Sequence, residues 1–417
     1  MCFPALGKQV ADQVGTNEVQ QTRQLPSRSA NAGNETDLPF EELFQPPLPV
    51  EPPINGRIAA IIPAFNEEPV LEGTITALLA SGCLLNDIYV VDDRSTDRTA
   101  EIAQALGVNV YTVPTNGGKA RAQEAALRHF QLLERYGWVL FLDGDTKVDK
   151  LFLSEMRKAA AENRGKVALY VGQVRSVRNS HIYSAYRAME YSIGHDLFKQ
   201  GQSNCNVILV SPGCASMYRS SVLKDLHIDS STLAEDMDLT IQTHRKGLEV
   251  CYVSTALVYT QDPSTFKDYY KQVLRWNRGF WQIVKKHKFF ILKPGIKKQR
   301  IDLYVVFLAL DILVMNKLMM AGFVAVLRPA LLPYFVAGDL TLGLCTAIYA
   351  GCRTKRLDVV YKFPIIYWIS FVNLFAFLSA MVDIIFLQKT NLNWNKVKRY
   401  DFDSHASPFE SAGLEKT

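Results

Sequence analysis

Val139-Leu140-Phe141-Leu142-Asp143-Gly144-Asp145 joins a short apolar run to two carboxylates that flank a glycine. Four apolar residues that end at turn-forming residues predict a short buried strand, and the glycine lets the backbone turn sharply after it. Asp143 and Asp145 can then face one point, where carboxylate oxygens suit Mg²⁺ or Mn²⁺ together with phosphate oxygens and water. Acidic turns at strand ends are common, so this pattern alone does not establish a metal site.

Other short β-rich runs surround this strand in the sequence. They are Ile58 to Ile62, Ile88 to Val91 and Val108 to Val113, and the stretches between them have helical spacing. Such alternation predicts an α/β fold with a mostly parallel sheet and helices on both faces. Because ligands bind at the carboxyl ends of the strands in such sheets, the residues that follow each strand form the candidate site.

Polar side chains follow two of these strands. Pro63-Ala64-Phe65-Asn66-Glu67 comes after the first strand, and Asp92-Asp93 closes the second. We assign Asp97 to capping of the next helix. Two adjacent carboxylates repel each other, so we expect them to accept hydrogen bonds from the ribose and base of a nucleotide. Asp93 is the preferred candidate of the pair.

The segment Thr232-Leu233-Ala234-Glu235-Asp236-Met237-Asp238 supplies the candidate general base. It has the pattern of a helix start, where the helix dipole favours acidic residues in any protein, and this alternative applies to Glu235 and Asp238. A single displacement by a hydroxyl group needs one general base to take its proton. We assign that role to Asp236.

Gln272-Val273-Leu274-Arg275-Trp276 lies in a segment with helical spacing and several aromatic residues. An amphipathic helix at a membrane surface explains this pattern as well, and the two interpretations are compatible. The guanidinium of Arg275 offers a planar fork to phosphate oxygens, and Trp276 offers a flat apolar face to a sugar. The segment therefore suits the junction between a diphosphate and a saccharide.

Composition limits the class of protein. The 417 residues carry a net charge of +5 without a basic stripe, so we exclude a nucleic-acid partner. The seven cysteines are scattered and form no CxxC pair, which indicates neither a disulfide framework nor a zinc site and favours a reducing compartment. Residues 1–50 are polar and are expected to be disordered, and a proline cluster at 46–53 marks the domain boundary.

Three apolar segments follow the α/β region. Leu303 to Leu327, Pro329 to Ala350 and Phe363 to Leu387 each have about 20 residues or more, the length that a bilayer requires. Buried core helices are the alternative, but these runs show no regular polar face. The sequence therefore predicts an integral membrane protein.

Basic residues on both sides of the last segment leave its topology open. One cluster precedes it and one follows it: Arg353, Lys355, Arg356 and Lys362, then Lys396, Lys398 and Arg399. Both clusters favour the cytoplasmic side, which one crossing cannot satisfy. Either one segment is re-entrant or interfacial, or one of the basic clusters breaks the rule. The first segment, with Asp311, Asn316 and Lys317, is the candidate for the irregular one. These polar residues could equally line a pathway for a product, because ionisable groups within a membrane are costly.

Taken together and in order, five motifs resemble the processive family 2 glycosyltransferases. They are Pro63-x-x-Asn66-Glu67, Asp92-Asp93, Asp143-x-Asp145, Glu235-Asp236 and Gln272-x-x-Arg275-Trp276. That family includes cellulose, chitin, hyaluronan and poly-N-acetylglucosamine synthases, and the resemblance covers about residues 57 to 290. Two departures are Ala234, where many relatives carry threonine, and Arg94, where a small residue is common.

The resemblance implies a GT-A fold, a UDP-sugar donor, inversion at the anomeric carbon, and Mg²⁺ or Mn²⁺ at Asp143 and Asp145. It implies donor contacts by Glu67, Asp92, Asp93, Lys119, Asp143 and Arg275. It assigns acceptor binding to Gln272 and Trp276, and catalysis to Asp236 with Glu235 beside it. The alternative for Lys119 is a solvent-exposed lysine at a helix start. Residues 211–216 are expected to contribute to the acceptor pocket.

The predicted organisation is a disordered Pro-rich segment at 1–56, a GT-A domain at 57–262, interfacial helices at 263–300, transmembrane helices at 301–388 and a polar tail at 389–417. We expect a multi-pass protein of the cell membrane, with a cytoplasmic catalytic domain that extends a polysaccharide on a saccharide or lipid-linked acceptor. Export is expected to involve a partner subunit or a second copy. The alternatives are transfer of one or a few sugars to a lipid carrier, or a membrane scaffold or transporter with an inactive transferase domain.

Overall fold

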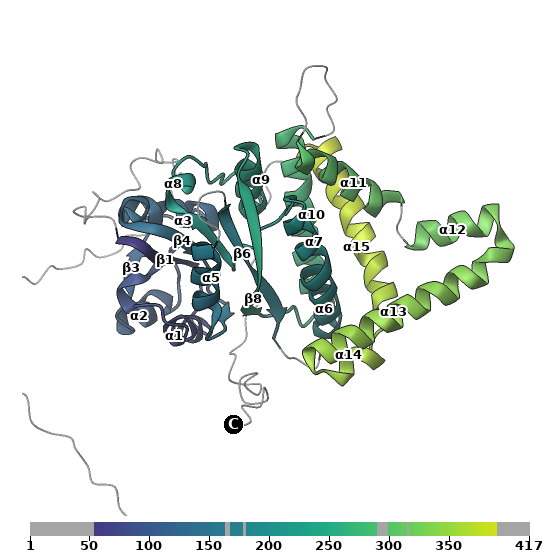
Figure 1. The fold of residues 1–417 in the computed structure, drawn as a ribbon, viewed down its shortest axis with the longest axis horizontal. Coiled ribbons are helices and arrows are strands. Elements are labelled where there is room, and N and C mark those ends of the chain that lie inside the picture. The colour runs from purple at the N-terminus through teal and green to yellow at the C-terminus, as the bar shows by residue number, and fades with distance from the viewer. Residues whose placement is uncertain (1–53, 163–166, 178–180, 290–298, 315–316, 390–417) are drawn as a thin grey trace, which may run out of the picture. The chain divides into compact units, whose positions relative to one another are not determined.

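The computed structural model describes residues 54–162, 167–177, 181–289, 299–314 and 317–389. The segments expected to be disordered or polar at the two ends of the chain, 1–56 and 389–417, therefore lie almost wholly outside the described residues. The first part of the described chain forms an eight-stranded sheet with helices on both faces (Figure 1).

The strands of the sheet follow the order β3-β2-β1-β4-β7-β6-β8-β5. Their bounds are β1 Ile54–Ala64, β2 Ile88–Asp92, β3 Asn109–Thr112, β4 Tyr136–Phe141, β5 Lys147–Val148, β6 Val167–Ser176, β7 Ser216–Arg219 and β8 Glu249–Thr260. β1 pairs in parallel with β2 and β4, β2 with β3, and β6 with β8. β7 is antiparallel to β4 and β6, and β5 is antiparallel to β8. The predicted mostly parallel sheet and its four predicted strands are confirmed.

Alternation along β1 explains why both faces of the sheet are covered. Ile58, Ala60 and Ile62 point into one apolar core, which includes residues of α1 (Leu71–Ala80) and α5 (Phe152–Glu162). Ala59 and Ile61 point into the other core, with residues of α3 (Lys119–His129). Successive side chains of a strand face opposite sides, so an uninterrupted apolar strand requires helices on both faces.

Shorter elements complete the α/β region. They are η2 Leu85–Asp87, α2 Thr99–Ala105, α4 Leu132–Arg135, α6 Ile182–Ile193, the π-helix η3 Gly194–Lys199, α7 Gln200–Asn204, α8 Ser220–Leu223 and α9 Glu235–Arg245. The helices that follow the last strand are α10 Phe266–His287, α11 Arg300–Val314, α12 Lys317–Leu327, η4 Pro329–Leu331, α13 Leu332–Thr354, α14 Leu357–Tyr361, α15 Ile365–Met381 and the π-helix η5 Val382–Phe386.

Strand register brings three polar strand ends to one edge of the sheet. Ala64 at the end of β1 is the partner of Asp92 at the end of β2. Beyond the ladder, the Asp93 N–H donates to Ala64 O at 2.8 Å and the Leu142 N–H donates to Ile61 O at 3.0 Å. The residues after β1, β2 and β4 are therefore neighbours.

Among the described residues, two helices are long and apolar enough to cross a membrane, Pro329–Thr354 and Ile365–Phe386. They correspond to the second and third predicted segments. The first predicted segment, Leu303 to Leu327, is the candidate for an irregular one, and this stays a prediction. It contains α11 and α12, with residues 315 and 316 outside the described chain, and neither helix alone has the length of a span.

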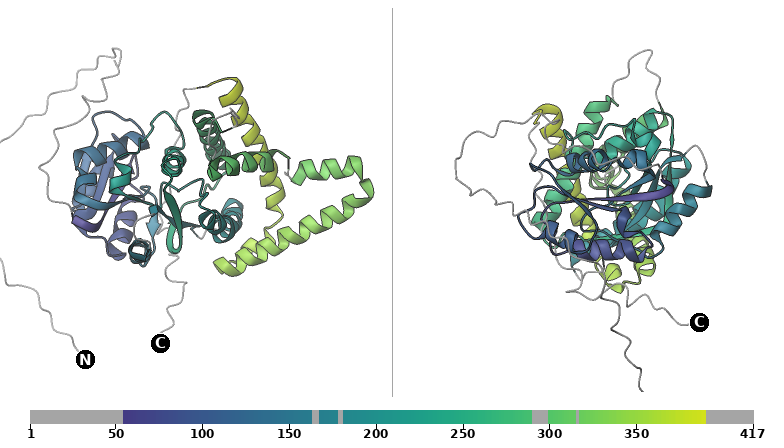
Figure 2. Two further views of the ribbon diagram at one scale, coloured as in Figure 1. Left: turned by 45° about the horizontal axis from the view of Figure 1, so that its top comes forward. Right: turned by 90° about the vertical axis from the view of Figure 1, so that its left-hand side faces the viewer.

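α15 packs along α10, and α12 packs beside α13 (Figures 1 and 2). α10 has the pattern of an amphipathic helix. Its buried side includes Tyr269, Val273 and Trp281, whereas Lys267 and Lys271 are exposed. This arrangement places the segment with Gln272, Arg275 and Trp276 between the sheet region and the apolar helices.

Candidate active site

The loop after β1 is held by the loop after β2. The Asn66 N–H donates to Ser95 Oγ at 2.9 Å, and Asn66 Oδ1 accepts from the Thr96 N–H at 2.8 Å. Asn66 adopts a left-handed backbone conformation with φ of 53°, which asparagine tolerates better than most residues. These contacts fix the direction in which Glu67 leaves the sheet.

Glu67 lies against the acidic turn after β4. It is buried, and a Cβ placed on Gly144 would lie only 2.8 Å from Glu67 Cγ. The carbonyl of Gly144 also accepts a hydrogen bond from Thr74 Oγ1 at 2.8 Å. The glycine of the Asp143-Gly144-Asp145 turn therefore permits the close approach of Glu67, and its φ does not lie in the left-handed region that favours glycine.

Asp92 and Asp93 are both buried, and each carboxylate accepts backbone hydrogen bonds. Asp92 Oδ1 accepts from the Ser95 N–H at 3.1 Å. Asp93 Oδ1 accepts from the Gly117 N–H at 2.8 Å, and its Oδ2 accepts from the Gly118 N–H at 2.7 Å. Burial raises the pKa of Asp93 to about 6, although these two amides act in the opposite direction. Asp93 thus shapes the loop that leads into α3, and the predicted nucleotide contact remains a prediction.

The rim is the edge of the sheet that carries the candidate site, together with the start of α9. Lys119, the first residue of α3, connects two parts of this rim. Its Nζ lies 2.5 Å from Asp143 Oδ1 and 3.3 Å from Glu235 Oε1, and its side chain is only 19% exposed. Burial would lower the pKa of Lys119, but the charges of Asp143, Glu235 and the nearby Asp236 outweigh it and raise that pKa above its usual value. The alternative of a solvent-exposed lysine at a helix start is therefore wrong.

Gly213 lies directly against the Lys119 ammonium group. A Cβ at this position would overlap Lys119 Nζ and would approach Glu235 Oε1 to 3.8 Å. The Gly213 N–H also donates to Asp236 Oδ2 at 3.2 Å. The segment 211–216, expected at the acceptor, therefore lies between Lys119 and the candidate base.

Asp236 lies in the first turn of α9 and is held by backbone amides. Besides Gly213, the Met237 N–H donates to Asp236 Oδ1 at 2.7 Å. Burial raises the pKa of Asp236 to about 6, and the charge of Glu235 adds to this shift whereas Lys119 opposes it. A carboxylate with this pKa is largely ionised at neutral pH and is still a useful proton acceptor.

Asp238 has a different environment from Asp236. It is fully buried, its Oδ2 lies 2.8 Å from Lys286 Nζ and its Oδ1 lies 2.7 Å from His287 Nε2. Burial would raise the pKa of Asp238, but hydrogen bonds from His287 and Lys286 lower it below the usual value. Asp238 therefore joins α9 to the end of α10. This structural role agrees with the alternative given above, in which Asp238 has no part in catalysis.

α10 approaches the rim through a glycine. A Cβ on Gly279 would lie 2.7 Å from the Cβ of Ala234, the residue before Glu235. Trp276 lies about one helical turn earlier, is 39% exposed, and has the Arg187 guanidinium 4.6 Å from its ring centre. Gln272 Oε1 accepts a hydrogen bond from Arg187 Nη2 at 2.8 Å. Arg275, between them, is half-buried.

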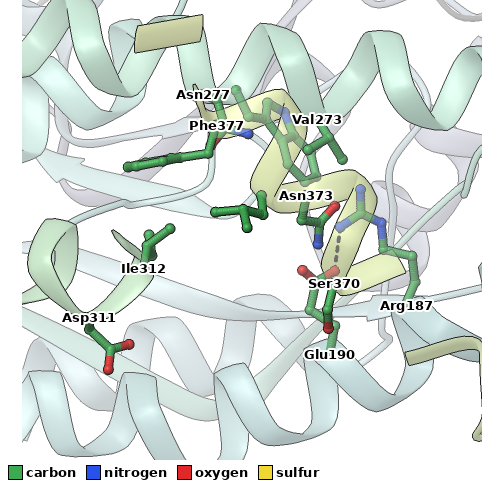
Figure 3. Close-up of a pocket in the computed structure, with 11 residues that line it drawn as sticks. Arg187, Glu190, Val273, Asn277, Asp311, Ile312, Ser370, Asn373 and Phe377 are labelled. Carbon is green, nitrogen blue, oxygen red and sulfur yellow. Dashed lines mark hydrogen bonds and ion pairs between the residues drawn. The ribbon is translucent and has the colours of Figure 1, made fainter. Parts of the chain in front are cut away.

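A cavity of about 380 Å³ opens beside Trp276, between α6, α10, α11 and α15 (Figure 3). Its polar lining residues are Arg187, Glu190, Asn277, Asp311, Ser370 and Asn373. The prediction that Asp311 faces a polar space agrees with this lining, whereas Asn316 and the side chain of Lys317 lie outside the described residues. The cavity can accommodate a polar ligand next to apolar helices.

The predicted metal ligands fit a divalent ion that is shared with a substrate. No group of three His, Cys, Asp or Glu side chains that could hold a metal occurs within the described ranges. Asp143 and Asp145 alone provide two carboxylates at the exit of β4, and Asp145 is buried. Mg²⁺ characteristically takes one or two carboxylates and completes its shell with phosphate oxygens and water. The donor set is therefore suitable for a metal diphosphate.

The structure brings most of the predicted residues together and adds Arg187, which the sequence did not indicate. Lys119, Asp143, Glu235 and Asp236 form one cluster, and Gln272 with Trp276 forms a second cluster around Arg187. Arg187 belongs to no motif that identifies it in a single sequence, whereas Gly213 lies within the expected segment 211–216. Arg187 is recognised only when α6 and α10 are packed, because it is separated from Gln272 by 85 residues.

The family description "Glycosyltransferase like family 2" matches residues 53–279. A poly-beta-1,6-N-acetyl-D-glucosamine synthase of Staphylococcus epidermidis is 25% identical over 253 residues, which are 60% of this chain and 59% of the relative. The enzyme of the same name from Staphylococcus aureus strain COL is 24% identical over 256 residues, with the same two coverages. The match thus spans about three fifths of each of these relatives.

A solved structure supports the fold independently. A mannosyltransferase from Pyrobaculum calidifontis, in complex with GDP-Man and Mn²⁺, superimposes with a TM-score of 0.54 at 17% identity. The superposition covers 84% of this chain and 93% of that protein. The described chain has the GT-A fold that the sequence motifs predicted.

Proposed function

This chain belongs to glycosyltransferase family 2, and we propose that it is an inverting, membrane-bound enzyme that transfers a sugar from a UDP-sugar to a growing polysaccharide. One observation carries this proposal. Lys119 joins Asp143, at the end of a parallel strand, to Glu235, next to the candidate base Asp236. A donor diphosphate and an acceptor hydroxyl would have to meet at such a cluster.

Residues after three parallel strands would bind the donor. Glu67, Asp92 and Asp93 lie where a nucleoside would approach the edge of the sheet, and Asp143 and Asp145 would hold Mg²⁺ or Mn²⁺. The ion would neutralise charge on the departing nucleoside diphosphate. Lys119 and Arg275 are cations suited to the same phosphates. Donor binding would compete for Lys119 with its ion pair to Asp143.

The proposed reaction is one displacement. The acceptor hydroxyl oxygen forms a bond to the anomeric carbon, the bond from that carbon to the diphosphate oxygen breaks, and UDP leaves with the electron pair. Asp236 takes the hydroxyl proton, and the backbone amides of Gly213 and Met237 keep its carboxylate oriented. One displacement inverts the configuration at the anomeric carbon.

The cavity beside Trp276 is the proposed acceptor site. Trp276 offers an exposed indole face for sugar C–H groups, and Arg187, Glu190, Asn277 and Asn373 offer hydrogen bonds around it. Gly279 of α10 packs against Ala234, close to Asp236 in the sequence. Trp276 lies about one turn earlier on α10, so an acceptor that stacks on Trp276 would extend towards Asp236. Gln272 contributes indirectly, because it holds Arg187.

Association with the cell membrane, with the catalytic domain on the cytoplasmic side, completes the proposal. α13 and α15 provide the apolar length, and exposed aromatic side chains such as Trp368, Phe371 and Phe375 would contact lipid. The same surface next to the acceptor cavity favours a second candidate function, the transfer of one or a few sugars to a lipid carrier. The two functions share every donor residue and differ in product length.

The test is a donor panel with product sizing. The full chain in nanodiscs would be given UDP-sugars with Mg²⁺ or Mn²⁺, and release of UDP and product length would be measured. We expect metal-dependent turnover of one donor and a long, glycosidase-sensitive product. A short lipid-linked product would instead establish the carrier-lipid function. Absence of turnover with every UDP-sugar and acceptor would contradict the proposal and favour a scaffold or transporter with an inactive domain.

A further inference from the structure

α15 exposes a continuous apolar stripe on one side only. Trp368, Phe371, Phe375, Leu378, Val382 and Phe386 are exposed and recur every three or four residues. The opposite side, with Ile369, Val372, Ala376, Ala380 and Ile384, is buried. A stripe of this kind fits either a helix that crosses a membrane beside protein or a helix that lies along its surface, so the neighbours of α15 decide between the two.

The beginning of α15 is attached to the sheet region. Before α15 in the chain, Arg353 Nε in the last turn of α13 donates to Asp196 Oδ2 at 2.9 Å, and the buried Arg356, which precedes α14, donates from Nη1 to Ser184 Oγ at 3.1 Å. Asp196 lies in η3 and Ser184 in α6, and both elements contact the strands of the sheet. The ring of Trp368 then lies 6.3 Å from that of Phe266, the first residue of α10. This end of α15 is therefore on the side of the catalytic domain.

The end of the same helix is attached to the catalytic domain as well. Asp383 Oδ2 accepts a hydrogen bond from Arg278 Nε at 2.9 Å. The next residue of α10, Gly279, packs against Ala234 beside the candidate base, and Lys286 further along α10 lies 2.8 Å from Asp238. A helix that crossed the bilayer would place its two ends about 30 Å apart across the hydrocarbon core, with only one of them near a water-exposed domain.

Exposed charges on α10 are also inconsistent with a crossing of the bilayer by α15. α10 follows α15 from Phe266 to Arg278, so the two helices have a similar orientation to any membrane. Lys267 and Lys271 on this part of α10 are exposed. If α15 crossed the bilayer, these lysines would be held at membrane depth, where exposed charges are costly.

α13 differs from α15 in its exposure and in its neighbours. Tyr334, Leu340, Leu342, Leu344 and Ile348 are all exposed, and the buried positions of α13 are confined to its second half. Its last turn is fixed by the contact of Arg353 with Asp196, and its partner over the first half is α12. Of the two apolar helices, α13 is the one whose surroundings are suitable for a crossing.

We propose that α15 lies in the plane of the membrane interface, with its apolar stripe inserted into the leaflet that faces the catalytic domain, whereas α13 crosses the bilayer. This inference rests on the proposed membrane location and specifies its geometry. Both ends of α15 are then on the catalytic side. The basic cluster of Arg353, Lys355, Arg356 and Lys362 is then on this same side, the cytoplasmic side that such clusters favour.

Cysteine accessibility in sealed vesicles tests this arrangement. Lys355→Cys, Gln388→Cys and Arg328→Cys would each be made in a chain whose native Cys2, Cys205, Cys345 and Cys352 are replaced by alanine. A chain that keeps Cys205, exposed in the catalytic domain, reports the catalytic side. Each chain would be treated with a membrane-impermeant maleimide-polyethylene glycol, and sugar transfer would be measured on the same vesicles.

We expect Lys355→Cys and Gln388→Cys to react from the same side as Cys205, and Arg328→Cys, at the tip between α12 and α13, to react from the opposite side. Reaction of Gln388→Cys from the side opposite to Lys355→Cys would overturn the in-plane placement of α15. Reaction of all positions from one side would overturn the crossing by α13. Sugar transfer by these vesicles would show that either failure is separate from a failure of the proposed function.

Discussion

Two carboxyl groups in the candidate site have pKa values near neutral pH, and they differ in what surrounds them. Burial raises both pKa values, but the neighbouring carboxylate that adds to the shift is Glu235 for Asp236 and Asp92 for Asp93. This difference makes it possible to assign a pH dependence to one of them.

Activity is expected to fall as the pH drops below about 6, because Asp236 must be ionised to accept a proton and burial raises its pKa to about 6. The measurement is kcat/KM for sugar transfer between pH 5 and 8. In Glu235→Gln the negative charge that helps to raise the pKa of Asp236 is lost, so the acid limb should move to lower pH. An acid limb that stays in place in this variant would assign the titration to another group, such as Asp93.

Gly213→Ala is expected to reduce transfer by about 10²-fold with little change in melting temperature. The new methyl group would meet the flexible end of Lys119, so the ammonium group would move away from Asp143 and Glu235 while the backbone remains in place. Gly201→Ala, where a Cβ meets no atom within 4 Å, is the matched control. Wild-type kinetics in Gly213→Ala would contradict the role of the Lys119 cluster.

Individual residues of the rim were predictable from sequence because strand ends are marked by the change from apolar to acidic residues. Asp93 and Asp143 could be singled out in this way, whereas Asp236 was selected from an acidic helix start and the need for one general base. The contacts of Lys119 with Asp143 and Glu235 could not be predicted, since they depend on side chains from α3, the turn after β4 and α9. Arg187 was missed for the same reason, because its partners lie on α10.

At the scale of elements, the contact between α9 and α10 positions the base relative to the acceptor cavity. Gly279 permits this contact, and its neighbours are the Cβ and backbone of Ala234 and the carbonyl carbon of Leu233. Backbone atoms cannot give way as a lysine side chain can. A change at Gly279 should therefore separate the two helices.

Gly279→Ala is expected to destabilise the protein by about 1–3 kcal/mol through overpacking. Transfer should fall by up to about 10²-fold, because small displacements of reacting groups have large effects on rate. Thermal unfolding and kcat would be measured beside Gly322→Ala on α12, where a Cβ meets no atom within 4 Å. Equal behaviour of the two variants would show that the approach of α10 to Ala234 has no functional importance.

The helices after the sheet show where hydropathy is insufficient. Apolar length correctly indicated α13 and α15, whereas in the run from Leu303 to Leu327 the described residues form α11 and α12, each shorter than a span. Hydropathy indicates whether a segment is surrounded by an apolar environment. It does not indicate whether the helix crosses the membrane or lies along its surface. The contact of Arg278 with Asp383 after α15, and that of Arg353 at the end of α13 with Asp196, are ion pairs between distant segments, which the sequence pattern does not contain.

At the scale of the whole molecule, a GT-A domain is joined through α10 to apolar helices, and the proposed acceptor cavity lies at that junction. The α/β class and the edge of the sheet that carries the site followed from the alternation of strands and helices. The identity of the sugar did not follow, because donor selectivity depends on the shape of a pocket that no motif describes.

The central claim is that Asp236 is the base of a sugar transfer, and a comparison of Asp236→Asn with Asp238→Asn tests it most directly. The two aspartates are two positions apart on α9, but Asp238 binds Lys286 and His287 and has no proposed contact with substrate. Sugar transfer per folded molecule and melting temperature would be measured for both variants in the same membrane preparation.

We predict that Asp236→Asn loses about 10²–10⁴-fold in kcat and keeps the wild-type melting temperature. Asp238→Asn should keep most of the activity per folded molecule and lose about 1–3 kcal/mol of stability, since it weakens a buried ionic contact. Near-wild-type transfer by Asp236→Asn, or an equal loss of activity in both variants without unfolding, would contradict the account.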